Sequence, residues 1–426
     1  MNKEDLKKIK VLYYPYKLLK RSIQIISDFF KDGNARRTLI AYQKSINNEK
    51  DNIRVGFIVQ MSNIWDKQKN VYDLMSNHEQ IETIMIVVPP FDFTKNVITD
   101  YEPNNYFLKE YPEAIKGLTP DGRIININDL DLDYIFLQRP YDRYLPVEMR
   151  SYNLCKISKV CYIPYGFSMS KDFTSLNTNK AFFRNVYFSF LECDEILEIL
   201  KSSFRKNIRD KVQKFEKTGF PEFDSYKVSH KNNSDKKTIL WTPRWSYDPV
   251  LGGSHFFEYK DEILNFAEKN PYLSIIIRPH PLMFENFIKE GKMSKKDVAE
   301  YKRKLDEYNI ELSIGKSCYE DLSRADILIS DFSSIIAPFF MTGNPIIYCE
   351  NHETNTYYES KMIFDFLYKC TSWASIEKEI KLLIDGCDEK KNKRLESIKH
   401  LSDGNASKRI VDLIINDYKE NSKCLQ

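Results

Sequence analysis

The sequence predicts an α/β protein with two doubly wound parallel sheets facing a cleft, preceded by a basic helical arm. Short, continuous apolar runs alternate with helical segments, as expected for strands buried on both faces of a parallel sheet. At 426 residues the chain is long enough for about two domains. The alternation is interrupted once, by the polar stretch 227–237. We expect an arm over 1–50, an acceptor-side domain over 51–226 and a nucleotide-donor domain over 227–426.

The arm carries the basic excess of the chain. Residues 1–50 hold twelve Lys or Arg and five Asp or Glu, whereas the whole chain has a net charge of +3. From Pro15 to about residue 30, apolar residues recur at helical spacing with basic residues opposite them. Two hypotheses stay open: residues 1–31 lie on an anionic membrane, or the apolar face packs on the protein or on a second subunit of a homo-oligomer. The arm has no recognition motif for nucleic acid, so none is an expected partner.

The expected strands follow in chain order. In the first domain they are the apolar runs at 53–60 and 83–92 and the first parts of 133–144 and 159–170, which read as strand then loop, whereas 181–218 reads as mostly helical. In the second domain they are the runs at 238–242, 273–277, 310–314, 326–330 and 345–349, separated by helical segments. Ligands of such sheets bind beyond the carboxyl ends of the strands. The loops after these runs are therefore the places to look for chemistry.

Composition narrows the class of protein. No apolar run reaches the length of a membrane span, and the N-terminus lacks a signal peptide's uninterrupted apolar core. The eight cysteines are scattered without a C-x-x-C or zinc-type spacing, which indicates reduced thiols in a cytoplasmic protein. Neither a Walker P-loop nor G-x-G-x-x-G occurs, which argues against kinases and NAD-dependent enzymes.

The loop at 241–259 follows the first strand of the second domain. It contains Arg244 just past the strand, then Gly253, Ser254 and His255 before a helix. Glycine and serine at a helix start leave backbone N–H groups free to meet an anion. The alternative is a plain turn with a serine N-cap.

The loop "RPHP" (278–281) follows the next strand. Arg278 offers a planar fork to phosphate oxygens, and His280 is a candidate cationic donor or general acid near neutral pH. Prolines on both sides of His280 restrict the backbone, so the ring is held in place before a ligand arrives.

The loop after the strand at 326–330 contains Asp331, and then Ser333 and Ser334 at the start of an apolar helix. Hydroxyls and free N–H groups there can bind a phosphate, although an ordinary N-cap has the same sequence. Because the three loops leave strands of one sheet, we expect them to converge on a site for a nucleotide diphosphate. No metal-ligand motif is present, so we expect no cofactor and no metal: Arg, His and helix starts supply the positive field.

Several motifs in this order resemble the bacterial CDP-glycerol glycerophosphotransferase family. They are "TGFPEFD" (218–224), "ILWTPRW" (239–245), "RPHP", "SDFSS" (330–334) with "PIIYC" (345–349), and "DGNASKRI" (403–410). The resemblance implies a GT-B-like fold with two Rossmann-like halves. It also implies transfer of glycerol phosphate or ribitol phosphate from a CDP-linked donor, CDP-glycerol or CDP-ribitol, to a glycan or lipid-linked acceptor. Such enzymes work in teichoic acid or capsule synthesis, peripherally on the inner face of the cytoplasmic membrane.

The resemblance also implies roles for single residues. Arg278, His280, Ser333 and Ser334 fall where the family holds the donor pyrophosphate, and Asp331 positions that loop. The family's His-Gly pair, whose His is the candidate acceptor base, is replaced by Tyr165-Gly166. His255 and, on the acceptor side, Asp66 are the other candidates for the base.

Three functions are compatible with these motifs. The leading hypothesis is phospho-polyol transfer with release of CMP. A GT-B glycosyltransferase with a nucleotide-sugar donor would use the same phosphate-binding loops. A non-catalytic membrane-associated scaffold would explain the loss of the His at Tyr165.

Overall fold

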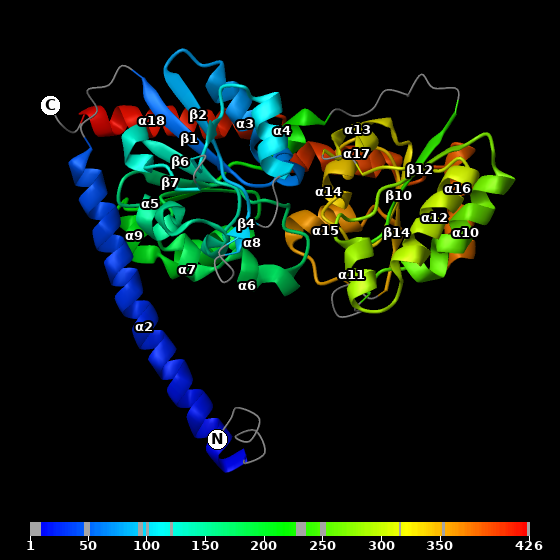
Figure 1. Cartoon of the computed structure of the whole chain (residues 1–426), viewed down its shortest axis with the longest axis horizontal. Helices are drawn as coiled ribbons and strands as arrows, with labels where there is room; N and C mark the ends of the chain where they lie inside the picture. Colours follow the sequence, from blue (N-terminus) through cyan, green and yellow to red (C-terminus); the bar gives the residue numbers. More distant parts are fainter. Residues whose placement is uncertain are drawn as a thin grey trace.

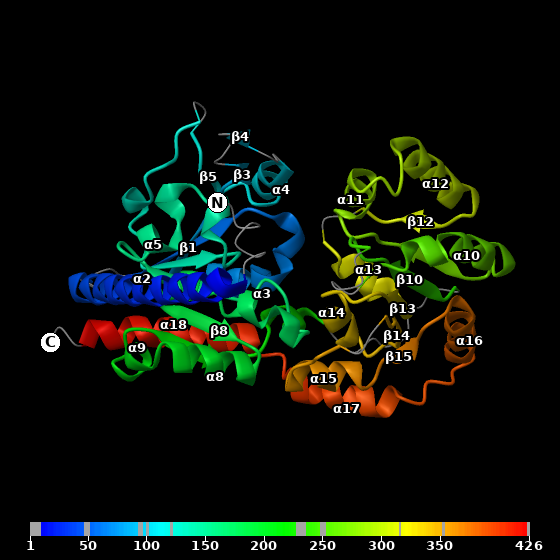
Figure 2. The same cartoon turned by 90° about the horizontal axis from the view of Figure 1, so that it is seen from below.

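The computed structural model describes residues 10–46, 52–92, 97–98, 102–119, 122–226, 236–247, 253–314, 317–351 and 354–423. It contains two parallel sheets with helices on both faces, and the sheets lie side by side in two views (Figures 1 and 2). We call the elements packed on the first sheet the N-terminal lobe and those packed on the second the C-terminal lobe. The predicted linker, apart from its last two residues, lies outside the described residues.

The first sheet has the order β5-β2-β1-β6-β7-β8-β9, and each neighbouring pair is parallel. Alternate residues of β1 enter different cores: Phe57 packs on one face of the sheet and Ile58 on the other. The strands are β1 (Ile53–Val59), β2 (Ile81–Val87), β5 (Ile115–Lys116), β6 (Tyr134–Leu137), β7 (Lys159–Tyr162), β8 (Phe188–Leu191) and β9 (Lys214–Lys217). The expectation that 181–218 is mostly helical was wrong for β8 and β9, whose four residues each are too few to establish a period.

The second sheet has the order β12-β11-β10-β13-β14-β15, also parallel throughout. Its central strand β10 lies between β11 and β13, so the loops after these three strands are neighbours. The strands are β10 (Thr238–Thr242), β11 (Ser274–Ile277), β12 (Glu311–Leu312), β13 (Ile327–Ser330), β14 (Ile346–Cys349) and β15 (Tyr368–Cys370). A short antiparallel pair, β3 (Phe91–Asp92) and β4 (Val97–Ile98), stands apart from both sheets.

Helices cover both faces of each sheet. In the N-terminal lobe they are α2 (Lys10–Ser45), α3 (Asp66–Ser76), α4 (Glu102–Glu110), α5 (Ser151–Leu154), α6 (Thr174–Asn177), α7 (Lys180–Phe183), α8 (Asp194–Ser203) and α9 (Arg205–Arg209). In the C-terminal lobe they are α10 (Phe256–Lys269), α11 (Met283–Lys289), α12 (Lys295–Glu307), α13 (Tyr319–Arg324), α14 (Ile336–Phe340), α15 (Tyr358–Phe364), α16 (Trp373–Ile384) and α17 (Lys391–Leu401). Together these layers give the doubly wound α/β architecture that the sequence predicts.

The last helix, α18 (Ala406–Lys423), returns to the N-terminal lobe (Figure 1). Its Ile410 and Ile414 are buried in the core that contains Phe57 of β1. Its Asp417 accepts hydrogen bonds from Lys159 of β7. The assignment of all of residues 227–426 to the second domain therefore does not hold for α18. The helical period predicts an apolar face but does not say which sheet will cover it.

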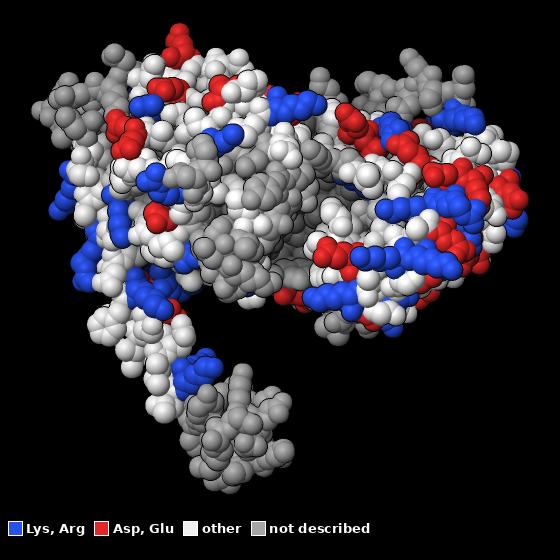
Figure 3. All heavy atoms as spheres, viewed as in Figure 1, with Lys and Arg blue, Asp and Glu red and all other residues white. Residues whose placement is uncertain are grey.

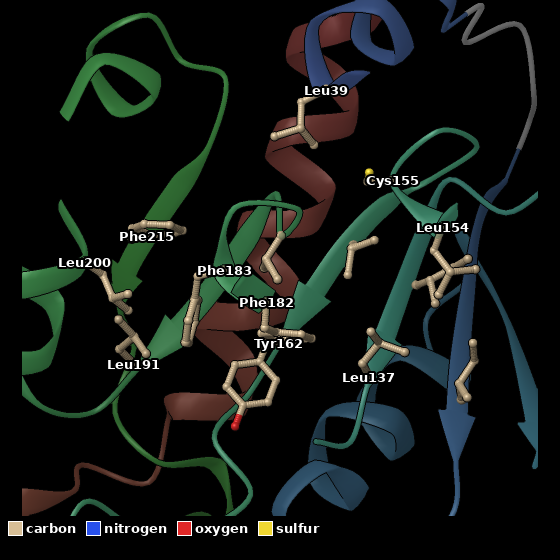
Figure 4. Close-up of a cluster of buried hydrophobic side chains, with 14 of the residues drawn as sticks. Leu39, Leu137, Leu154, Cys155, Tyr162, Phe182, Phe183, Leu191, Leu200 and Phe215 are labelled. Carbon is tan, nitrogen blue, oxygen red and sulfur yellow. The ribbon is translucent and has the colours of Figure 1, made fainter. Parts of the chain in front are cut away.

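Helix α2 is divided into a docked part and a projecting part. Near its C-terminal end, Leu39 is 2% exposed and lies at the edge of the buried cluster in Figure 4. Toward its N-terminus the helix extends away from the lobe (Figure 1), and its large apolar side chains there are 57–75% exposed. These exposed residues are Leu18, Leu19, Ile23, Ile25, Ile26, Phe29 and Phe30. The helix begins before Pro15 and ends after residue 30, so it is longer than predicted.

Ion pairs fix the angle at which α2 leaves the lobe. Arg184, between α7 and β8, donates to Asp28 at 2.9 Å and to Asp32 at 3.1 Å. Arg36 pairs with Asp210 at 2.7 Å. Within the described part of the chain, no helix combines the length and the apolarity needed to cross a bilayer.

Candidate active site

The carboxyl ends of both sheets meet at the junction of the lobes, where Figure 3 shows a hollow. The loop after β7 crosses this junction: Phe167 and Met169 are buried in the core that contains Leu240 of β10. Phe173, farther along the same loop, stacks on Phe332 after β13 with ring centroids 6.2 Å apart. Loops from both sheets are therefore brought together, as expected for a ligand site between doubly wound units.

Arg244 lies just beyond β10 and is the least compensated cation of the predicted donor loops. Its Nη1 donates to the carbonyl of Phe332, and its guanidinium lies over the Phe332 ring, 5.2 Å from the centroid. The side chain makes no ion pair with any described carboxylate, and its buried Nε has no hydrogen-bond partner. Burial lowers the pKa of this guanidinium, which still remains charged at neutral pH. The nearby Asp331 carboxylate acts on this charge but is itself paired with His255, so Arg244 is a candidate site for an anion.

Asp331, at the end of β13, is 0% exposed and holds the Arg244 loop in place. Its carboxylate accepts from the backbone N–H of Arg244 at 2.8 Å and from the backbone N–H of His255 at 3.3 Å. It also contacts Nδ1 of His255 at 2.6 Å and Ser254 Oγ at 3.5 Å. Asp331 is therefore a positioning residue that ties β10, α10 and β13 together.

These contacts correct the prediction for the loop before α10. Where free N–H groups were expected, the N–H of His255 and the hydroxyl of Ser254 donate to a protein carboxylate, Asp331, and Gly253 and Ser254 are buried. His255 is 4% exposed and its ring stacks on Tyr259, so it cannot reach an acceptor hydroxyl as a base. Burial opposes the charge on His255, but the hydrogen bond to Asp331 outweighs it and raises the pKa of the imidazole. The pair is a structural ion pair.

Arg278 is committed to protein groups rather than left free for phosphate. Its Nη1 donates to Asp321 of α13 at 2.8 Å and to Ser313 at 3.0 Å. The sequence shows the cation at a strand end, but the carboxylate that pairs with it lies 43 residues later in the chain. The expectation that Arg278 presents its fork to the donor is therefore not met in this arrangement.

His280 faces the junction with an exposed ring. Its Nδ1 accepts from the backbone N–H of Leu282 at 3.2 Å, so the neutral ring carries its proton on Nε2. Partial desolvation by the surrounding protein, followed by the charge of Arg244, lowers the pKa to about 4. His280 is thus a neutral donor at physiological pH and not the cationic group that the sequence suggested.

We expect the ring nitrogens of His280 to titrate near pH 4 in the free protein, against about 6.5 for an unperturbed histidine. Below that pH the ring becomes a cation beside Arg244, so the folded state loses stability as pH falls from the unfolded pKa toward the folded one. A bound pyrophosphate would supply negative charge and raise the pKa. Nitrogen-detected NMR titration with and without nucleotide measures both values; a free-protein pKa above 6 would contradict the assignment.

Ser333 and Ser334 lie in the turn before α14. Ser333 Oγ accepts from the N–H of Ile335 at 3.4 Å, and Ser334 is exposed. The apolar helix predicted behind them has five residues, because the turn at 341–343, in which Gly343 has a φ of 78°, ends it early. The hydroxyls remain available at the mouth of the site, beside the Phe332 carbonyl that Arg244 contacts.

On the acceptor side, Tyr165 lies after β7 with its hydroxyl 2.8 Å from that of Tyr141. Burial, followed by this hydrogen bond, raises the pKa of Tyr165, so the group is a phenol and not a base at neutral pH. A Cβ added to Gly166 would meet no heavy atom within 4 Å, so open space adjoins this loop.

Asp66, the first residue of α3, lies at the junction of the two lobes. It accepts from Ser317 of the C-terminal lobe at 3.0 Å. The neighbouring Lys67 is buried and pairs with Glu222 at 2.5 Å; burial opposes its charge, but Glu222 outweighs that and raises the pKa of Lys67. Asp66 is thus part of an interlobe contact.

The sequence reasoning overlooked a cluster at the ends of β1, β6 and β7. Arg139, after β6, donates to Gln60 Oε1 at 3.0 Å, and its guanidinium lies 4.7 Å from the ring centroid of Tyr144. Tyr141 and Tyr165 complete the cluster. Its signal was available in "QRPYDRY" (138–144), where basic and aromatic residues follow a strand end.

Two groups of possible metal ligands occur among the described residues. His255, Asp331 and Cys349 form one, and Asp66, Glu222 and Cys318 form the other. In each, a carboxylate is already ion-paired within the protein: Asp331 with His255, and Glu222 with Lys67.

Comparisons with known proteins agree with this architecture. A structure of the wall teichoic acid polymerase TagF is 16% identical, with a TM-score of 0.55 over 95% of this chain and 97% of that one. UDP-GlcNAc 2-epimerase from Neisseria meningitidis, bound to UDP-GlcNAc, is 15% identical, with a TM-score of 0.56 over 85% of this chain and 100% of that one. At such identities the likeness shows the fold, which is GT-B-like as predicted. A search of curated protein sequences gave no match.

The family model described as CDP-glycerol:poly(glycerophosphate) glycerophosphotransferase matches residues 184–416. This range is more than half of the chain. It includes all three donor loops and the return of the chain to the N-terminal lobe. The chain therefore belongs to the CDP-glycerol:poly(glycerophosphate) glycerophosphotransferase family and is a transferase.

Proposed function

We propose that the protein transfers glycerol phosphate or ribitol phosphate from a CDP-linked donor to a hydroxyl of a lipid-linked or oligosaccharide acceptor, releasing CMP. The product would be a teichoic acid or capsule-type polymer. The family match supports the donor class, and the fold is shared with a wall teichoic acid polymerase. The observation that carries the proposal is Arg244 at the strand ends, a half-buried cation whose side chain makes no ion pair with a described carboxylate and whose Nε has no hydrogen-bond partner.

In the proposed reaction, the acceptor oxygen attacks the phosphorus that bears the polyol. The bond from that phosphorus to the bridging oxygen breaks, CMP leaves with the electron pair, and the acceptor's proton passes to a base. Negative charge develops on the CMP phosphate, so fixed donors aimed at that group accelerate the reaction. Arg244, Ser333 and Ser334 are the residues that we propose bind the pyrophosphate.

His280 is proposed to donate a hydrogen bond from Nε2 to the leaving phosphate. Because its Nδ1 accepts from Leu282, the proton on Nε2 is held in the orientation that this role requires. Because the His280 ring is neutral, it places no second positive charge next to Arg244. The two side chains therefore do not repel each other in the free enzyme. We propose that this set works without a metal ion, since arginine supplies the positive charge.

The donor is identified by the nucleotide that is released. Incubation with CDP-glycerol, CDP-ribitol and UDP-sugars, each with oligosaccharide acceptors, is followed by chromatographic identification of the nucleotide product. CMP release supports the proposal. UDP release alone would mean a glycosyltransferase and would overturn it.

We also propose that the projecting part of α2 places the enzyme on the cytoplasmic face of the membrane. Its exposed apolar residues share a helix with basic side chains, visible on the arm in Figure 3. This combination suits the interface of an anionic bilayer. The docked part of α2, held by Arg184 and Arg36, would carry that anchorage to the N-terminal lobe.

Replacing Ile23, Ile26 and Phe30 with serine should lower binding to anionic vesicles by 100-fold or more, since each buried apolar side chain contributes about 1.5 kcal/mol or more. Co-sedimentation with phosphatidylglycerol vesicles measures the effect. A matched variant with serine at Leu74, Ile199 and Leu382, exposed elsewhere, should bind like the wild type. If the arm variant keeps vesicle binding but changes from dimer to monomer, the face packs on a second copy instead.

A further inference from the structure

A pocket of about 320 Å³ lies between α8 and α9 of the N-terminal lobe, outside the cleft between the lobes. Its lining residues are Glu198, Lys201, Ser202, Arg205, Ile208 and Arg209. Because β8 and β9 are parallel, α8 and α9 together carry the chain back from the carboxyl end of β8 to the amino end of β9. The second half of this connection, which forms the pocket, therefore does not belong to the site at the carboxyl ends of the strands.

The pocket forms where the helical connection is interrupted at Phe204. This residue has φ −119° and ψ 28°, outside the helical range, so α8 ends before it and α9 begins after it. Its buried ring packs on Phe215 of β9, with ring centroids 5.8 Å apart. Ile208 packs against the core of the lobe and gives the pocket an apolar wall. Buried Asn207 accepts from Arg36 of α2 at 2.8 Å, so the arm holds α9 in place.

The lining is rich in positive charge. Lys201, Arg205 and Arg209 stand against one carboxylate, Glu198, which leaves a net charge of +2. Arg209 pairs with Asp210 at 2.9 Å, whereas Lys201 and Arg205 make no ion pair with any described carboxylate.

The position of Arg205 does not favour helix α9. It is the first residue of α9, where the helix dipole opposes a cation, and it precedes the like-charged Arg209 by four residues. An anion bound between these side chains would remove both costs.

The pocket lies on the side of the lobe toward which the arm projects. In Figure 1, α7, α8 and α9 form the face of the lobe from which the N-terminal part of α2 extends, and Figure 2 shows α9 beside α2. Arg36 joins the two elements, because it donates to Asn207 and to Asp210 at the end of α9. A bilayer that receives the exposed apolar residues of α2 therefore lies on the side of the lobe that carries the pocket.

We propose that the pocket between α8 and α9 binds the phosphate headgroup of an anionic phospholipid in that bilayer. The planar fork of Arg205 matches two phosphate oxygens, Lys201 adds a point charge, and Ser202 adds a hydroxyl donor. The apolar wall at Ile208 suits the glycerol backbone of a lipid. The inference rests on the proposed membrane location of the enzyme, to which it adds a second, headgroup-specific contact. Two contacts fix the orientation of the lobe on the bilayer, which a single helix does not.

Co-sedimentation of the full chain with vesicles of phosphatidylcholine and phosphatidylglycerol tests the proposal. The double variant Lys201→Gln, Arg205→Gln should bind about 100-fold more weakly than the wild type, the loss expected for two charge-assisted hydrogen bonds. The double variant Lys206→Gln, Lys211→Gln removes the same charge from exposed positions of the same segment outside the pocket. It should lose about 10-fold or less, because only long-range attraction to the anionic surface is weakened. Equal losses would mean a diffuse attraction of basic side chains and would overturn the proposal.

Calorimetry with short-chain dihexanoyl phosphatidylglycerol, below its micelle concentration, tests the headgroup site without a membrane. The wild type and the Lys206→Gln, Lys211→Gln control should show a binding event that the Lys201→Gln, Arg205→Gln variant lacks. If inorganic phosphate at the same concentration displaces the lipid, the pocket holds a free anion and the lipid assignment is wrong. Thermal unfolding of each variant confirms that the lobe remains folded.

This measurement separates the headgroup site from the proposed role of the arm and from the proposed reaction. If the arm variant with serine at Ile23, Ile26 and Phe30 keeps its vesicle binding while the pocket variant fails to bind the short-chain lipid, the arm's role fails and the headgroup site stands. If the arm variant loses vesicle binding but all proteins bind the short-chain lipid equally, the headgroup site fails and the arm's role stands. Release of CMP from a CDP-linked donor is scored independently of both.

Discussion

We expect Arg244→Met to lower kcat for cleavage of CDP-glycerol by about 100- to 1,000-fold, the usual loss for one donor that stabilises developing charge. The reason is the state of the residue in the free protein. Its guanidinium is half buried and makes no ion pair with a described carboxylate, because the nearby Asp331 is paired with His255. An anion bound there is strongly attracted to the guanidinium, because a partly desolvated site screens charge less than water does. Rapid-quench measurement of CMP release gives the rate.

Two variants make this result specific. Arg244→Lys keeps a charge but loses the planar contact with Phe332, so it should recover part of the activity. Arg303→Met removes an exposed arginine of α12 that pairs with Glu307, and it should leave kcat unchanged. The assignment of Arg244 is wrong if Arg244→Met cleaves the donor at more than a tenth of the wild-type rate while remaining folded.

The strands that carry the donor loops were predictable because each is a short apolar run that ends in polar residues. The sheet order then brings the ends of β10, β11 and β13 together. The role of each polar residue was harder to predict from the sequence. Arg278 and Arg244 look alike in the sequence, yet the first side chain pairs with Asp321, whereas the second makes no ion pair with a described carboxylate. A pairing across 43 residues depends on tertiary packing and leaves no local pattern.

The same dependence on tertiary packing explains why the sequence did not reveal the roles of His255 and Arg139. His255 follows glycines and reads as a loop residue open to ligand, but the Asp331 carboxylate occupies the position expected for phosphate. Arg139 lies in a stretch that reads as strand and loop, and its contacts with Gln60 and Tyr144 depend on packing rather than on a motif. Local sequence patterns therefore predict where the cleft lies. Which charges in the cleft are paired can be read only from the packed structure.

The largest effect on stability is expected from Asp417→Ala in α18. Asp417 is 1% exposed and accepts from Lys159 at 2.5 Å, Lys214 at 2.7 Å and the hydroxyls of Tyr134 and Tyr187. Its removal leaves Lys159, 3% exposed, as a buried cation without its partner. Breaking one side of such a pair costs about 3–5 kcal/mol of unfolding free energy. Urea denaturation measures the loss, and the m-value shows whether α18 alone detaches.

The pH dependence distinguishes loss of the ion pair from loss of packing. Burial raises the pKa of Asp417, but Lys159 outweighs burial and the pKa is lowered, so wild-type stability is present above the unfolded value and falls as acid protonates the folded carboxylate. In Asp417→Ala this acid-dependent loss should be smaller. Burial lowers the pKa of Lys159, so the variant's deficit should shrink at high pH, where Lys159 loses its proton. Asp412→Ala, in the same helix and paired only with exposed Lys408, should cost less than about 1 kcal/mol. Equal costs at the two positions would mean that α18 is held by its apolar face, and that the buried charges do not fix its return to the first sheet.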